Sequence, residues 1–519
     1  MAATDPTLPG STEEPAQPAR RPSLLDALIP VGGLIVLLAL SFYLYGADAS
    51  QGPNQIALVF AAVLATLISF KNGRPWASIR AGAVEGVSSG LAAIFILLGV
   101  GALIGTWAMS GTILAMVYYG LQLLSPQYFY ASAALICAVV ATAIGSSWTV
   151  AGTIGIGLMG IAATMELSLA ITAGAVISGA YFGDKTSPLS DTANLAVAAA
   201  GSEIFSHIKE SLRISVPALV LALVFFALIG SPGDFDASAE LTRIGDRHHI
   251  TLWAFLPLLA VFVLAMLRTP PFLAIFAGAL LGGVLAVVQS PDKVLEFADA
   301  PDIPQSLALL KGAWSALATG YQSSTGDPAL DQLLSRGGMA SMMVTVWLIM
   351  TALAFGAVVE QAGLLNRLVD PIIDKAKSVA GLVGVVIGTA IGANLLTSDQ
   401  YIAIMLPGRM FRMEFKRRGL APVLLSRVVG DSATVTSPLI PWNSCGAYMA
   451  AALGIPASNY LIYCFFNLLN PLISFLFSLI GIGIVRVNPE AGDQTGDKHS
   501  ESTSLPNMEA PLGAKTGQP

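Results

Sequence analysis

The stretch from residue 81 to residue 200 constrains the fold more than any other feature of the sequence. Its charged side chains number five: Glu85, Glu166, Asp184, Lys185 and Asp191. The rest forms long apolar blocks, and a soluble fold would have no water-facing residues with which to cover them. Apolar runs of about 20 residues match the roughly 30 Å hydrocarbon core of a bilayer. A transmembrane barrel would instead alternate apolar and polar residues over about 10 positions. The sequence therefore predicts membrane-spanning helices.

The composition of the whole chain supports an all-α, polytopic transmembrane helical bundle. Of its 519 residues, 55% are hydrophobic and 11% are charged, against about 25% charged in a soluble domain. The three cysteines have no CxxC spacing, which argues against a disulfide framework or a metal site. The sequence has no glycine-rich phosphate loop ending in Lys-Ser or Lys-Thr, so nucleotide-driven pumping has no support. We expect no cofactor.

The apolar runs divide the chain into two membrane-embedded halves. We expect a disordered cytoplasmic tail at 1–22, an N-terminal transmembrane half at 23–288, a polar connecting segment at 289–338, a C-terminal transmembrane half at 339–487 and a second disordered tail at 488–519. Several runs are too short to cross a membrane alone. Broken helices or re-entrant hairpins are therefore expected, with about 10 to 13 crossings in all.

Basic residues indicate the orientation of the chain. Arg20 and Arg21 precede the first span, and the densest basic cluster lies at 409–418. Cytoplasmic loops are enriched in lysine and arginine. We therefore expect a multi-pass protein of the bacterial inner membrane with a cytoplasmic N-terminus.

The two halves resemble each other at one offset. The sequence Thr-Ser-Pro-Leu at 186–189 recurs at 436–439, 250 residues later, and a Gly-Asp pair precedes each copy. Internal repeats build many secondary transporters, whose binding sites lie near the midplane of the membrane where helices are interrupted. We therefore expect 183–194 and 430–444 to be non-helical and close to the midplane.

Oxygen-bearing side chains gather in both copies. Pro188 deprives the carbonyl of Asp184 of its helical partner, and hard oxygen ligands suit a small hard cation. Carboxylates buried in a membrane are costly and point to function. A carboxylate that holds either a proton or a cation gives the simplest route to coupled exchange. The candidate ion-binding and coupling residues are Asp184, Lys185, Thr186, Ser187, Asp191, Asn194, Asp399, Asp431, Thr436, Ser437 and Asn443.

Two segments resemble a known family. Residues 184–195, Asp-Lys-Thr-Ser-Pro-Leu-Ser-Asp-Thr-Ala-Asn-Leu, resemble a signature of the NhaC family of sodium/proton antiporters, and residues 434–447 are similar to its second signature. The resemblance covers about residues 24–487 and departs from the family at Gly430, where members often have glutamate. It implies that the two repeats are inverted and that Na+ and H+ are the transported ions. With sodium as the cation, the candidate site consists of Asp184, Asp191, Asp431, Ser187 and Ser437.

Other functions stay open at this point. The family also includes antiporters that exchange carboxylates such as malate and lactate, which arginine in the core would favour. There is no arginine between Arg80 and Arg213, but Arg409 and Arg427 keep this alternative open. A membrane-embedded hydrolase would need a base beside a nucleophile, and we expect all four histidines in loops, flanks or a tail. The prediction is thus a transporter, not an enzyme, with membrane lipid and no nucleic acid as partners and with homo-oligomerisation open.

Overall fold

The computed structural model describes residues 20–230, 237–247, 250–324, 331, 334–365, 367–368 and 376–487. Most of the first predicted tail and all of the second lie outside these residues. Within them every regular element is helical, apart from one isolated bridge between Leu420 and Arg486. The prediction of an all-α bundle is confirmed.

The helices of the first half follow one another with short connections. They are α1 (Leu24–Tyr45), η1 (Gly46–Gln51), α2 (Pro53–Lys71), α3 (Trp76–Ser89), α4 (Leu91–Met109), α5 (Thr112–Leu123), η2 (Pro126–Tyr128), α6 (Phe129–Ile144), α7 (Ser147–Val150), η3 (Ala151–Gly155), α8 (Ile156–Thr164), α9 (Leu169–Thr186), α10 (Asp191–Ala200), α11 (Ile204–Ile229), α12 (Ala237–Arg247), η4 (Leu252–Phe255), α13 (Leu256–Met266) and α14 (Pro271–Gln289).

The connecting segment and the second half are also largely helical. Their helices are α15 (Pro291–Ala298), α16 (Gln305–Thr319), η5 (Met339–Met342), α18 (Met343–Gln361), α20 (Val379–Thr397), α21 (Gln400–Met410), α22 (Arg412–Arg417), α23 (Pro422–Val429), η6 (Gly430–Thr434), η7 (Ser437–Leu439), α24 (Ser444–Leu453), α25 (Ala457–Tyr460), η8 (Leu461–Tyr463) and α26 (Phe465–Leu479).

Nine helical segments of the described residues are long and apolar enough to cross a bilayer. A tenth arises if Ala457–Tyr463 and Phe465–Leu479, bent by 52° at their junction, form one broken span. Ten is the lower limit of the about 10 to 13 crossings expected from the sequence, and nine lies just below it. Shorter helices such as α7 and α10 are packed between the long ones, so they do not have to span the membrane themselves.

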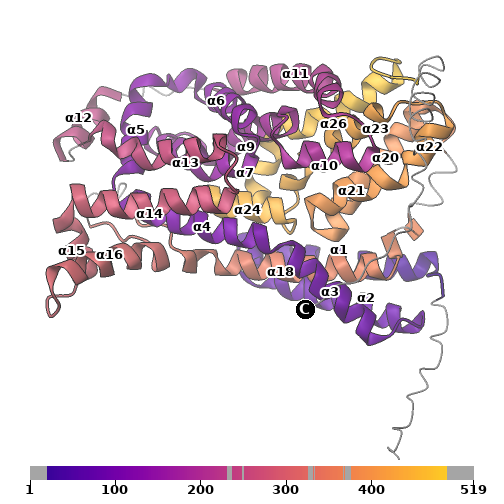
Figure 1. Ribbon diagram of the computed structural model, residues 1–519, viewed down its shortest axis with the longest axis horizontal. Coiled ribbons are helices and arrows are strands. Elements are labelled where there is room, and N and C mark those ends of the chain that lie inside the picture. The colour runs from indigo at the N-terminus through magenta and orange to yellow at the C-terminus, as the bar shows by residue number, and fades with distance from the viewer. Residues whose placement is uncertain are drawn as a thin grey trace, which may run out of the picture.

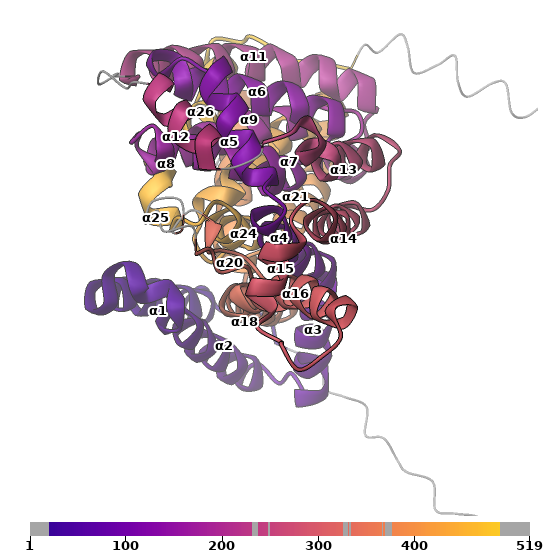
Figure 2. The same ribbon diagram turned by 90° about the vertical axis from the view of Figure 1, so that its left-hand side faces the viewer.

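The helices form an arm and a main body (Figures 1 and 2). α1 packs on α2, and α2 and α3 pack on α18; together they lie at the bottom of Figure 2. The main body above them holds α6, α9, α11 and α26. The middle of the molecule, around α7, α21 and α24, is where the helix breaks of both repeats come together.

The interruption in the first repeat is shorter than the sequence analysis predicted. α9 continues to Thr186 and α10 begins at Asp191, so 187–190 alone lie outside helices. Pro188 excludes helical backbone at the residue before it, and Ser187 is accordingly extended, with φ −90° and ψ 134°. Asp184 therefore stays on the last turn of a helix, and the prediction of a non-helical 183–194 was wrong at both ends.

The prediction for 430–444 was also wrong in part. Residues Gly430–Thr434 form a π-helix that continues α23, and Ser437–Leu439 form a 3-10 turn before α24 begins at Ser444. A π-helix also follows α7 in the first repeat, at Ala151–Gly155. Single π-turns are rare and concentrate at functional sites. Most of the backbone in these segments thus stays helical, and each repeat is interrupted over a few residues only.

The closest helix packing in the first repeat joins α6 to α9. Small residues make it possible, because a methyl group built on Gly179 would run into the backbone of Ala134, and one built on Gly183 into Ala141. This contact fixes the end of α9, and hence Asp184, against the turn that follows α6.

We predict that Gly179→Ala destabilises the protein, because the added methyl group would meet backbone that cannot move aside. Overpacking of this kind costs about 1–3 kcal/mol. A lower melting temperature of the purified protein, followed by size-exclusion fluorescence, would show it. Gly388→Ala is the matched control, since nothing lies within 4 Å of the added atom there. Equal melting temperatures for the two variants would contradict the packing.

Candidate functional site

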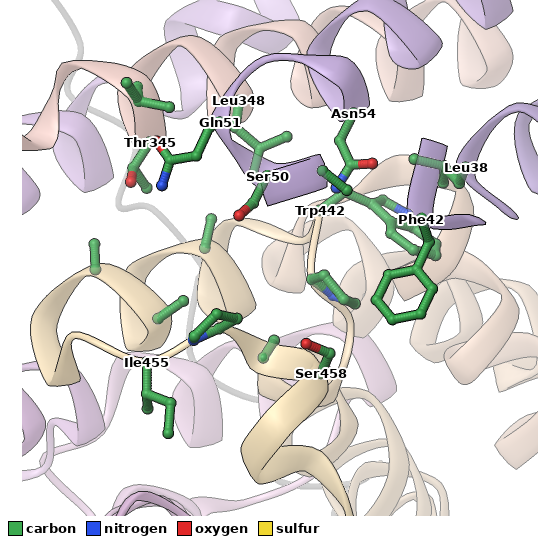
Figure 3. A pocket seen from close by; sticks show the side chains of 18 of the residues that line it. Leu38, Phe42, Ser50, Gln51, Asn54, Thr345, Leu348, Trp442, Ile455 and Ser458 are labelled. Carbon is green, nitrogen blue, oxygen red and sulfur yellow. The ribbon is translucent and has the colours of Figure 1, made fainter. Parts of the chain in front are cut away.

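Two cavities open between the helices, and they differ in their lining. The larger, of about 1040 Å³, lies between the α1–η1–α2 segment, α18 and α24 (Figure 3). Its walls are mostly apolar, and none of the described residues that line it is acidic. The smaller, of about 460 Å³, is lined by Asp184, Asp191 and Asp399 together with residues of both helix breaks. The smaller cavity is therefore the candidate site, although it has less than half the volume.

Two acids of this cavity are buried, Asp184 with 3% and Asp399 with 5% of its surface exposed, and Asp184 has the more hydroxyl partners. The Asp184 carboxylate accepts hydrogen bonds from the hydroxyl groups of Ser147 (2.6 Å), Ser190 (2.5 Å) and Thr192 (3.3 Å). The donors come from the start of α7 and from the 187–190 break with the first turn of α10. One carboxylate and three hydroxyl groups thus form a compact cluster of hard oxygens.

The turn after α6 brings Ser147 to Asp184. Gly145 adopts left-handed backbone (φ 79°) and ends α6, and a Cβ built on it would lie 2.8 Å from both the Leu189 Cβ and the Ser190 nitrogen. Only glycine allows this approach without strain. Ser190 is also the N-cap of α10 and accepts from the Ala193 N–H. The break and the turn are therefore built to meet at the Asp184 carboxylate.

Asp191 and Asn194 lie on the more exposed side of the cavity. The Tyr401 hydroxyl donates to Asp191 at 2.5 Å, which connects α10 to α21 of the second repeat. The Asn194 amide donates to the carbonyls of Ser190 (2.6 Å) and Pro188 (3.2 Å) and so steadies the break. Asp399 caps α21 by accepting from the Ile402 N–H.

The second repeat builds a similar turn with neutral groups. Ser398 ends α20 in left-handed backbone (φ 58°), and its carbonyl accepts from the Ser444 N–H at 2.9 Å. The Asn394 amide donates to the Ala433 carbonyl (2.7 Å) and the Thr436 hydroxyl (3.1 Å). Asn443 donates to both oxygens of Asn394. At the offset of 250, the residue that matches Asp184 is Thr434, so this copy carries no acid at that point.

A second buried acid of this repeat, Asp431, lies further from the turn and forms an ion pair with Lys185. Both side chains are at most 1% exposed. Asp431 also accepts from the Asn470 amide (3.1 Å) and the Ser474 hydroxyl (2.7 Å), and Arg427 lies 3.5 Å from it. Lys185 and Asp184 are neighbours in sequence but hold different partners. The ion pair therefore ties α9 of the first repeat to η6 of the second.

The remaining predicted hydroxyl groups make local hydrogen bonds. Thr186 donates to the Phe182 carbonyl, and Ser187 accepts from the Leu189 N–H. Ser437 donates to the Thr434 carbonyl. The five residues predicted as one sodium site thus fall into two networks, one at Asp184 and one at Asp431, with Ser187 and Ser437 bonded to their own breaks.

Sequence reasoning missed several partners of these acids. Ser147, Thr192 and Tyr401 at the first network, and Ser215, Asn470 and Ser474 at the second, were not among the predicted residues. A signal was present in the apolar run 457–486, where Asn467, Asn470 and Ser474 recur at helical spacing.

His207 was also misplaced by the sequence analysis. It was expected in a flank, but it lies fully buried in α11, with its ring 3.0 Å from the Ser426 hydroxyl. The polar residues around it suggested a loop, whereas Glu203 caps the helix and lets it begin at Ile204. Among the described residues, no group of three or more His, Cys, Asp or Glu side chains is arranged to hold a metal ion.

Trp148 and Tyr448 join the two repeats beside the cavity. Their rings stack with centroids 4.0 Å apart and an angle of 13°, and the Tyr448 hydroxyl donates to the Trp148 carbonyl at 2.7 Å. Trp148 follows Ser147 directly, so the stack holds the tip of α7 against α24.

Known proteins of similar sequence and a family model match most or more than half of this chain. The model of the Na+/H+ antiporter family matches residues 179–482. The Na(+)/H(+) antiporter NhaC of Alkalihalophilus pseudofirmus is 33% identical over 88% of this chain and 96% of its own. The arginine/ornithine antiporter ArcD of Halobacterium salinarum is 34% identical over 92% and 96%. The malate-2H(+)/Na(+)-lactate antiporter of Bacillus subtilis is 31% identical over 90% and 94%.

We predict that the smaller cavity is open to water. Asn194 is exposed in it, so a cysteine at that position should react with a membrane-impermeant thiol reagent added from one face of the membrane. Thr172→Cys is the matched control, because Thr172 is fully buried and should stay unlabelled. Cys137 and Cys464 are buried outside the cavity, whereas Cys445 is buried but lines it, so labelling of the wild type gives the background. An unreactive Asn194→Cys in folded protein would contradict the prediction.

Proposed function

Because this chain belongs to the NhaC family of Na+/H+ antiporters, we propose that it exchanges Na+ for H+ across the membrane, with the two ions competing for Asp184. Family membership makes the chain a secondary transporter and not an enzyme. It is a multi-pass membrane protein, as are its relatives. The identity of the exchanged solutes is instead inferred from the residues of the candidate site.

The oxygen cluster at Asp184 is the observation that supports the proposal most directly. A hydroxyl group has one hydrogen to donate and two lone pairs to offer. Ser147, Ser190 and Thr192 can therefore donate to the empty carboxylate, as they do here, or turn their lone pairs toward a bound cation. Sodium would be held by the carboxylate and these hydroxyl groups, which are hard oxygen ligands.

Competition follows from the burial of the carboxylate. An isolated charge in a low-dielectric site is costly, so Asp184 is best satisfied when it holds either a proton or a cation. One ion must leave before the other can bind, and that exclusion couples the two fluxes. Asp191 and Asp399 add negative charge to the cavity lining and would attract cations toward it.

The position of arginine favours a bare cation over a carboxylate in the buried part of the cavity. Arg427 is engaged with Asp431 and the Gly483 carbonyl, and it does not line this cavity. Arg268 is the one basic side chain among the described residues that do, and it is exposed. Exchange of a small carboxylate is the second candidate, supported by Arg268 and by a volume large enough for an organic solute.

We predict that Asp184→Asn abolishes Na+-dependent proton flux in proteoliposomes while the protein still inserts and folds. The substitution removes the carboxylate for which, in this proposal, both ions compete. The matched control is Asp292→Asn, which neutralises an exposed acid on α15, outside the cavity. Sodium-dependent acidification or alkalinisation at the wild-type rate in Asp184→Asn would refute the proposed role.

We predict that Ser147→Ala and Ser190→Ala raise the KM for sodium by about 5- to 10-fold, since a hydrogen-bonding group is typically worth about 1 kcal/mol. The maximal rate should change less, because the carboxylate remains. Ser69→Ala is the control: Ser69 is buried but donates to the Ala65 carbonyl of its own helix. A KM unchanged in both cavity variants would place the cation elsewhere.

The identity of the transported solute is tested by adding Na+, Li+, K+, malate with lactate, or arginine with ornithine in turn to the same liposomes. Sodium alone should drive proton movement in the wild type. If malate or lactate is needed, and Arg268→Gln removes that requirement or the flux, the carboxylate alternative holds. An arginine–ornithine exchange that proceeds without sodium would contradict both.

A further inference from the structure

Asp184 and Asp431 differ in their distance from the proline that follows them and in what their side chains face. Asp184 lies four residues before Pro188 and faces a cavity, whereas Asp431 lies seven residues before Pro438 and faces Lys185. The shift of three residues is about one helical turn. It moves the second acid from the break into contact with a cation that belongs to the first repeat.

The surroundings of the Lys185 ammonium are rich in oxygen. Its Nζ contacts Asp431 Oδ1 and donates to the Ser215 hydroxyl at 2.6 Å. Ser215 in turn donates to the Asn470 side-chain oxygen at 3.3 Å. The carboxylate and the hydroxyl group contact the ammonium directly, and the amide oxygen lies one hydrogen bond further on. Hard oxygens of this kind also suit sodium.

The chemistry at Asp431 therefore parallels that at Asp184. Each carboxylate accepts from neutral side chains that hold it in place: Ser147, Ser190 and Thr192 at Asp184, and Asn470 and Ser474 at Asp431. The difference is that the chain supplies its own cation to Asp431. Lysine carries a compact point charge at the end of a flexible stem.

The group around Asp431 holds two cations of the chain for one carboxylate. Arg427 lies 3.5 Å from Asp431, and these two charges cancel. Lys185 then leaves the group with one positive charge in excess. Glu210 pairs with Arg213, and His207 contacts Ser426 and Ser211. One sodium ion in place of the ammonium would restore the same total charge.

We propose that the Lys185 ammonium occupies what would otherwise be a second sodium site at Asp431, so that the chain exchanges a single sodium ion per cycle. The assignment of that single ion to Asp184 rests on the proposed function; the blocked site at Asp431 does not. The ammonium cannot leave the protein, so it contributes charge and a bond between the repeats but no ion flux. Removing it uncovers a sodium site.

The test is equilibrium binding of radioactive sodium to purified protein in nanodiscs. The wild type should bind one sodium ion, and Lys185→Ala should bind two. Asp184→Asn should bind none, and the double variant Asp184→Asn with Lys185→Ala should bind one. Two sodium ions in the wild type, or no added ion in Lys185→Ala, would overturn the proposal.

The same four proteins separate this proposal from the proposed function. If the wild type binds no sodium but Lys185→Ala binds one ion, the role of Asp184 fails and the blocked site stands. If the wild type binds one ion that Asp184→Asn loses, and Lys185→Ala gains none, the role of Asp184 stands and the blocked site fails.

Stability gives a second measurement, because Lys185→Ala removes the closest cation from the buried Asp431 carboxylate and leaves Arg427, 3.5 Å away, as its remaining ion partner. A ligand that binds only the folded state raises the melting temperature in a concentration-dependent way. Sodium should therefore raise the melting temperature of Lys185→Ala more than that of the wild type, and choline should not. Lys185→Ala with Asp431→Asn is the matched control, with no acid left to bind the ion. Equal sodium effects in the single and double variants would overturn the proposal.

Discussion

The rest of the structure depends on the cost of burying a carboxylate between membrane helices. Asp184 and Asp431 are 3% and 0% exposed in the middle of the molecule, and each must be satisfied by the chain or by an ion. The helix breaks supply what Asp184 needs, since the residues at 187–190 and the turn at Gly145 bring hydroxyl groups to it. A continuous helix would have kept those hydroxyl groups on its own surface. The proline, the left-handed glycine and the close α6–α9 packing all serve to place these oxygens.

The Asp431 carboxylate is paired with a cation of the chain, and this ion pair links the two repeats. Its ion pair with Lys185 joins residues 246 positions apart and is buried on both sides. Removing one partner of such a pair is strongly destabilising, so the pair holds α9 against η6, while Trp148 and Tyr448 do the same at the tips of α7 and α24. Asp184, one residue from Lys185, keeps no ion partner among the described residues. The turn of the second repeat, built from Asn394 and Asn443, brings no acid to the position that matches Asp184. In the proposed function the exchangeable charge is therefore at Asp184.

The sequence was sufficient for the class of fold, because charge-poor blocks and proline breaks act locally. It also included both acids among four candidate aspartates, Asp184, Asp191, Asp399 and Asp431, because a carboxylate in an apolar context is costly. It could not assign their partners: nothing local to Lys185 indicates Asp431, and Ser147 looks like an ordinary turn residue. The extent of the breaks was overestimated because polar residues at 183–186 resemble a loop, whereas packing of Gly183 against α6 keeps them helical. His207 was misplaced for the same reason, as a capped helix start has the composition of a flank.

The central claim is that one carboxylate, Asp184, holds either a proton or a sodium ion. The most direct measurement is the number of protons released when sodium binds, obtained by titration calorimetry of the purified protein in buffers with different heats of protonation. We expect about one proton to leave for each sodium ion bound at a pH where the carboxyl group is protonated beforehand, and we expect the release to disappear at higher pH while binding persists. Sodium binding without proton release at every pH tested would contradict the claim, because the two ions would then occupy separate sites.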